Sequence, residues 1–152
     1  VFNRNLWTPE GVYVVQDLES IGRSQPLNRK DLKKMLKGGK DISGIRFSRD
    51  ESVRFAPRGS YQLGKHEPES LAKDGFLIAS YGLEGAEKLG EVSTKFKNKP
   101  HIYGVEYGVE TDKEEQRVSA LGGDGGIGGL GLCVLGGDFG DGGGCHAFGV
   151  LE

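Results

Sequence analysis

The alternation of apolar and polar residues along the chain predicts several short strands. Residues 12–15 are all apolar, a pattern typical of a buried strand. Residues 102–110 alternate between apolar and polar side chains with a period of two, which predicts a strand with one buried face. Shorter apolar runs predict two more strands, over 76–79 and over 117–121.

Helical spacing and capping residues predict three helices. Asn28 is a good N-cap for a helix over 28–37, in which apolar residues recur three or four apart, and Gly38 and Gly39 would end it. A short helix is expected over 68–73. A third helix is expected after Ser80, with apolar residues at spacing three, although its glycines weaken the pattern: Leu83, Ala86 and Leu89.

Three segments lack clear periodicity. Residues 1–10 are expected to form an arm on the domain surface, and residues 40–66 are polar and irregular. From residue 122 onward glycine is the commonest residue. This last segment is either a disordered tail or, since it contains two apolar arms around a Gly/Asp-rich turn, a hairpin at about 124–145.

The two cysteines, Cys133 and Cys145, lie one on each arm of that expected hairpin. A disulfide between them would close a glycine-rich loop and stabilise the fold by roughly 3 kcal/mol. Disulfides persist in oxidising compartments, so this interpretation predicts a secreted, extracellular protein.

The composition of the chain bears on which kinds of partner it can bind. The chain has 152 residues, a net charge of −2 and a pI near 6, which favours one compact domain and does not suggest a nucleic-acid binder. The densest basic stretch, 29–37, alternates with leucines and is interpreted as a solvated helix face, the alternative being a binding patch. No apolar run reaches the 18 residues expected of a membrane span.

No metal site is expected. The cysteines and the three histidines lack the closely spaced ligand pairs typical of zinc sites. The acidic residues of the glycine-rich region lack the regular spacing and bidentate glutamate of a calcium loop: Asp124, Asp138 and Asp141.

One motif carries a resemblance to a known family. The sequence Val-Ser-Ala-Leu-Gly-Gly at 118–123 resembles the A chain of the cholera toxin and heat-labile enterotoxin family of ADP-ribosyltransferases, in which a Glu-any-Glu pair precedes it. Glu115 and Gln116 match the first two positions of that pair. Other segments resemble the family in the same order: 12–13, 28–39, 58–64, 74–80, 101–105 and 147–152.

The resemblance covers about residues 12–152 and implies a fold. We expect one domain, 1–152, of the α+β class, with an ADP-ribosyltransferase-like split mixed β core. Two small sheets would surround a cleft, short helices would flank them, and the glycine-rich hairpin at about 124–145 would be an insertion.

The family's chemistry implies site residues. These enzymes cleave the bond between nicotinamide and ribose in NAD, through a transition state with positive charge on the ribose, as in glycoside hydrolysis. By position, Glu115 would be the carboxylate and Ser80 the last serine of the family's Ser-Thr-Ser strand. Tyr13 and Arg58 would lie where the family binds NAD.

The positions that matter most for catalysis depart from the family pattern. The NAD-anchoring arginine is replaced by Val14, the first two residues of Ser-Thr-Ser by Ile78 and Ala79, and the essential second glutamate by Arg117. Two unit charges about 4 Å apart interact by roughly 4 kcal/mol at an effective dielectric constant of 20. Reversing the sign of this charge turns stabilisation of the transition state into repulsion, so no cofactor is expected unless the chain is active on NAD.

The sequence therefore predicts a secreted toxin-like or effector-like virulence protein, monomeric and without transferase activity, that binds a host protein. The candidate surfaces are the former cleft near Tyr13, Ser80 and Arg117, and the glycine-rich hairpin. One alternative is an active NAD-dependent mono-ADP-ribosyltransferase or NAD glycohydrolase that uses Glu114 or Glu115 as its carboxylate. The other is an unrelated glycine-rich surface binder.

Overall fold

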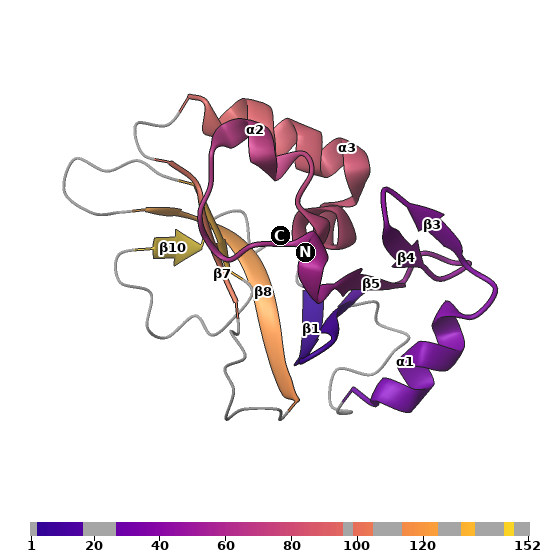
Figure 1. Cartoon of the computed structure of the whole chain (residues 1–152). Coiled ribbons are helices and arrows are strands. Elements are labelled where there is room, and N and C mark those ends of the chain that lie inside the picture. The colour runs from indigo at the N-terminus through magenta and orange to yellow at the C-terminus, as the bar shows by residue number, and fades with distance from the viewer. Residues whose placement is uncertain are drawn as a thin grey trace.

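A computed structural model describes residues 3–16, 27–95, 99–104, 114–124, 132–135 and 145–147. Within these ranges the molecule is a mixed α+β protein in which helices pack on an antiparallel sheet (Figure 1). In the part of the chain that is described, no helix is long and apolar enough to cross a membrane.

Five antiparallel strands form the main sheet, in the spatial order β3-β4-β5-β2-β1. Their bounds are β1 (Asn3–Thr8), β2 (Gly11–Gln16), β3 (Lys40–Ile42), β4 (Ile45–Phe47) and β5 (Val53–Pro57). The hairpin between β1 and β2 requires glycine at position 11. A Cβ atom there would stand 2.3 Å from the carbonyl oxygen of Ala56 on the neighbouring strand.

The long strand β8 (Glu115–Asp124) joins this sheet to a second, smaller one. Its first half pairs with β1, and its second half pairs with β9 (Leu132–Leu135) on the opposite edge. Beyond β9 lie β7 (His101–Tyr103), in parallel, and then β6 (Gly64–Lys65). The expected strand at 117–121 is therefore confirmed, and it holds the two sheets together.

Two apolar clusters cover the two faces of the main sheet. Successive residues of a strand point to opposite faces, and accordingly Leu6 packs under α1 (Arg29–Leu36) whereas Trp7 packs under α3 (Gly75–Ser93). Two shorter helical turns are η2 (Arg58–Ser60) and α2 (Pro68–Leu71). Figure 1 shows α2 and α3 side by side, well separated from α1.

Helix α1 confirms the prediction for 28–37. The Asn28 side chain accepts hydrogen bonds from the backbone nitrogens of Lys30 and Asp31 at 2.9 and 3.3 Å, and Gly38 follows the helix with φ of +75°. The expected strand at 12–15 and the short helix at 68–73 are also confirmed, by β2 and α2. The capping residues and apolar patterns that predict these elements lie within or next to each element.

The strand expected at 76–79 is wrong, because these residues form the first turns of α3. Short apolar runs do not separate a buried strand from a buried helix. Asp74 rather than Ser80 is the N-cap, since its Oδ1 accepts from the nitrogens of Phe76 at 3.0 Å and Leu77 at 3.2 Å. The helix is interrupted at Gly82, whose φ of +80° and ψ of 169° are not helical.

Two further expectations are corrected. Within residues 1–10, expected as a surface arm, Asn3–Thr8 instead form β1, a buried strand between β2 and β8. Residues 40–66 are not irregular but contain β3, β4, β5, η2 and β6. Of the strand expected at 102–110, β7 covers the beginning, and residues 105–110 lie outside the described residues.

The glycine-rich region is described only at β9 and at β10 (Cys145–Ala147). Gly122 of β8 is opposite Cys133 on one edge and Ala147 on the other, so β8 runs between β9 and β10. Two strand spacings, about 9–10 Å, therefore separate the arms, whereas a disulfide joins Cα atoms less than about 7 Å apart. This backbone does not favour a direct hairpin. The cysteine side chains lie outside the described residues, and their disulfide stays a prediction.

Candidate functional site

A cluster of buried polar groups lies where β1 meets α3, and it contains Ser80. The Asn3 side chain donates through Nδ2 to the carbonyl oxygen of Ser80 at 3.0 Å. Asn5, two residues along the same face of β1, is 0% exposed, and neither polar atom of its amide has a hydrogen-bond partner among the described residues. The buried hydroxyl of Ser80 likewise has no partner within the described part of the chain. A buried polar group that loses its water on folding and gains no partner costs about 1–3 kcal/mol.

The interruption of α3 explains part of this cluster. In an unbroken helix the carbonyls of residues 79 and 80 would accept from nitrogens four residues later, but the backbone at Gly82 leaves the helical path. Arg54 of β5 donates from Nη1 to the Ala79 carbonyl at 2.8 Å, and Asn3 donates from Nδ2 to the Ser80 carbonyl. Two side chains of the sheet thus bind the carbonyls at the break.

Strand β8 passes directly beside this cluster. In the β1–β8 register Asn3 is opposite Ser119, Asn5 is opposite Arg117, and Trp7 is opposite Glu115. The structure therefore brings Ser80 close to the strand that bears Glu115 and Arg117. The side chains of Glu115 and Arg117 lie outside the described residues.

The other positions that the sequence resemblance assigns to an NAD site are packed into the interior. Val14 and Ala79 are 0% exposed, Ile78 is 1% exposed, and Ser80 is 4% exposed. The first three belong to the apolar cluster beneath α3, together with Trp7 and Phe76. In the described part of the chain, these four positions are covered by their neighbours and do not face solvent.

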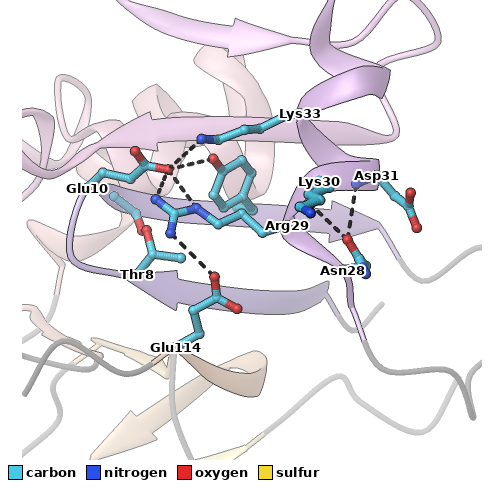
Figure 2. Close-up of polar contacts among 10 residues, drawn as sticks. Thr8, Glu10, Asn28, Arg29, Lys30, Asp31, Lys33 and Glu114 are labelled. Atoms are coloured by element: carbon cyan, nitrogen blue, oxygen red, sulfur yellow. Dashed lines mark hydrogen bonds and ion pairs between the residues drawn. The ribbon is translucent and has the colours of Figure 1, made fainter.

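Tyr13 lies in a different place, on the α1 side of the sheet. Its hydroxyl donates to Glu10 Oε1 at 2.9 Å, and Arg29 of α1 donates from Nε to the same oxygen at 2.8 Å (Figure 2). Arg29 Nη1 also contacts Glu114 Oε1 at 3.4 Å, and Lys33 Nζ lies 3.5 Å from Glu10. Glu10 is thus the centre of an ionic network that joins the β1–β2 turn, α1 and the residue before β8.

This network shifts the acidity of its members. Burial, together with the hydrogen bond to Glu10, raises the pKa of Tyr13 to about 12. Burial acts to raise the pKa of Glu10, but the hydrogen bonds from Arg29 and Tyr13 and the nearby positive charges outweigh it, so the net pKa is lowered. The hydrogen bond to Glu10 raises the pKa of Arg29. These shifts all favour ionised Glu10 and Arg29 and a neutral phenol.

A surface hollow of about 280 Å³ opens beside the network. Tyr13 and Phe55 form its apolar floor in an edge-to-face contact, with ring centroids 4.6 Å apart. Its other lining residues are Glu10, Lys33, Leu36 and Arg46. Its rim carries two cations, Lys33 and Arg46, and the carboxylate of Glu10, and its aromatic floor suits one apolar side chain.

The predicted site residues therefore fall into two groups. Tyr13 contacts Glu10 through its side chain, and the backbone nitrogen of Arg58 donates to the Glu10 carbonyl at 3.0 Å. Glu114 joins them through Arg29. Ser80 instead contacts Asn3, which lies at the end of β1 away from the Glu10 turn. Of the cleft expected around Tyr13, Ser80 and Arg117, Tyr13 and Ser80 lie on opposite faces of the sheet, and the Arg117 side chain lies outside the described residues.

Comparison with known protein families, with curated protein sequences and with solved structures gave no match.

Sequence reasoning missed four residues that organise these clusters: Glu10, Arg29, Asn5 and Arg54. Glu10 follows proline in a turn, and Arg29 sits among lysines, so neither differs from ordinary surface charge. The asparagines of β1 carry a weak signal, since Asn3 and Asn5 alternate with Arg4 and Leu6 at the strand period. Nothing in the sequence near Arg54 indicates a carbonyl partner 25 residues away.

Proposed function

We propose that this chain is a secreted, toxin-like or effector-like protein with an ADP-ribosyltransferase-like fold that has lost NAD chemistry and acts by binding a host protein. The fold proposal rests on the resemblance of residues 118–123 and on their place in β8, beside the strand hairpin that contains Val14. The α+β arrangement of two sheets joined by β8 is compatible with it.

One observation supports the proposed loss of NAD chemistry. The positions that the resemblance assigns to the NAD site are buried apolar residues or covered by them: Val14, Ile78, Ala79 and Ser80. A dinucleotide needs an open, polar cavity in which arginine can bind its phosphates in a bidentate manner. A valine packed in the core offers neither space nor charge. Arg117 in place of the essential glutamate adds repulsion toward the ribose cation.

The test is the release of nicotinamide from NAD, measured together with NAD binding by calorimetry. We expect neither turnover above a buffer control nor detectable heat of binding. Turnover that Glu115→Ala abolishes would overturn the proposal. A matched variant, Glu84→Ala on the exposed surface of α3, controls for general effects of losing a carboxylate.

One observation favours the alternative, an active transferase or glycohydrolase. The unpartnered amide of Asn5 and hydroxyl of Ser80 lie beside β8, and polar groups of a ligand could satisfy them. In that case Glu115 would be the carboxylate, since the Glu114 carboxylate already contacts Arg29. NAD binding that Ser80→Ala weakens, with the far-ultraviolet circular dichroism unchanged, would favour this alternative.

A further inference from the structure

One end of the molecule concentrates positive charge. Residues 29–49 carry eight Lys and Arg against two Asp, a formal charge of +6, whereas the whole chain carries −2. These residues form α1, β3 and β4, which lie together at one end of the molecule (Figure 1). The rest of the chain is therefore acidic, and the charge is strongly asymmetric.

Several of these cations already have acidic partners. Lys40 Nζ lies 2.8 Å from Glu51, and Arg46 Nη1 lies 3.4 Å from Asp41. Arg29 is bound by Glu10 and Glu114. The positive charge of these residues is largely compensated within the fold.

The cations on the outer face of α1, unlike those just described, are not paired with acidic residues in the described part of the chain. Lys30, Lys34 and Lys37 are exposed and spaced four and three residues apart, which places them on one line along the helix. None of them forms an ion pair with any of the described residues. Arg49 extends this line, because its Nε donates to the Gly38 carbonyl at 3.1 Å, just beyond the end of the helix. We call these four residues the cationic stripe.

The neighbouring surface adds apolar contacts. Met35 of α1 is exposed. Lys33 and Leu36, on the adjoining side of α1, line the hollow floored by Tyr13 and Phe55. A linear row of cations beside an aromatic-floored hollow matches an extended acidic segment that carries one apolar anchor residue.

We propose that the cationic stripe and this hollow form the docking surface for an acidic polypeptide segment of a partner protein. This inference rests on the proposed function, in which the chain binds a host protein, and it names the chemistry of that partner. Carboxylates would contact the stripe, and an aromatic or aliphatic side chain would enter the hollow.

Other anionic partners fit this surface less well. Nucleic acids are held by many phosphate contacts over a basic surface, whereas the stripe has four cations and the chain as a whole is negative. Helices that bind membrane surfaces bury a wide apolar face, whereas α1 has eight residues and a single exposed large apolar side chain, Met35. A short row of carboxylates matches the length of the stripe.

The probe is a fluorescein-labelled peptide of alternating Asp and Glu with one central Phe, and the measurement is fluorescence anisotropy. We expect saturable binding that K34E/K37E weakens about tenfold or more. The matched control K65E/K88E makes the same charge change at exposed lysines away from the stripe and should leave affinity within about twofold. A peptide in which Ser replaces Phe should bind more weakly to the wild-type protein.

The other outcomes overturn either this inference or the proposed function on which it rests. Equal weakening by both double variants would mean a response to net charge alone. Tighter binding of a single-stranded oligonucleotide or of phosphatidylserine vesicles would assign the stripe to a different partner. Salt-sensitive self-association that K34E/K37E abolishes would assign it to a second copy of the chain. NAD turnover in the same samples would overturn the proposed function, whereas absence of peptide binding without turnover overturns this inference alone.

Discussion

The guanidinium of Arg54 on β5 donates to the carbonyl of Ala79 in α3 at 2.8 Å, just before the helix breaks at Gly82. The side chain is buried and also lies over the Phe47 ring, 5.1 Å from its centroid. Because burial disfavours the charged form, it lowers the pKa of Arg54. The contact joins the main sheet to the interrupted helix from within the core.

Replacing Arg54 with methionine should destabilise the fold. The Ala79 carbonyl would lose its charged donor, so we expect a loss of about 2–3 kcal/mol in the free energy of unfolding, measured by urea titration. Arg49→Met is the matched control, since Arg49 also donates to a carbonyl, that of Gly38, but on the exposed surface. It should change stability by less than about 0.5 kcal/mol. Equal effects of the two variants would contradict a special role for the buried contact.

Replacement of Asn5 should not lower the stability of the fold, in contrast to replacement of Arg54. The Asn5 amide is fully buried and forms no hydrogen bond with the described residues, so Asn5→Leu should leave stability unchanged or raise it by about 1 kcal/mol. Asn3→Leu, two residues away, removes the donor to the Ser80 carbonyl and should destabilise. Thermal unfolding of both variants measures the difference. A clear loss of stability in Asn5→Leu would mean that the amide has a bound partner, which would favour a ligand at the buried cluster.

Gly82 should resist substitution because of its backbone conformation alone. A Cβ atom there meets nothing within 4 Å, yet φ is +80° and ψ is 169°. Non-glycine residues avoid this region at a cost of about 1–3 kcal/mol, so Gly82→Ala should lower the free energy of unfolding by that amount. Gly59→Ala, where space is equally open and φ is not in the left-handed region, should have little effect. A neutral Gly82→Ala would indicate that α3 can close into a continuous helix.

The ionic network around Glu10 predicts a pH dependence of stability. The pKa of Glu10 is lowered in the folded state, so its contribution is complete above the unfolded value near 4.5 and disappears as pH falls through the lower folded value. Glu10→Gln should therefore cost about 1 kcal/mol at pH 7, because the carboxyl group is partly exposed, and almost nothing well below pH 4. Urea titrations between pH 7 and pH 3 measure this difference.

The partner of Glu10 supplies the control. In an Arg29→Gln background, Glu10→Gln should cost less at pH 7, since the strongest cationic contact has already been removed. A cost that is constant with pH, or unaffected by Arg29→Gln, would show that the network does not stabilise the fold.

The sequence alone determined the elements whose signals are local. Helix α1 follows from a capping asparagine, apolar residues at helical spacing and a terminating glycine pair, and β2 follows from four consecutive apolar residues. Strand β8 was predicted as a short strand, and the motif at 118–123 also gave the family resemblance. In each case the information lies within about ten residues.

Only the tertiary structure decided the rest, because the deciding contacts join distant segments. Asn3 and Asn5 look like surface residues, yet pairing of β1 with both β2 and β8 buries them in the middle of the sheet. Residues 76–79 could be strand or helix, and the Asp74 cap and packing on β1 and β2 made them helix. Tyr13 and Ser80 were expected in one cleft. They lie on opposite faces because strand alternation turns the Tyr13 side chain toward α1, while α3 covers the other side of the same sheet.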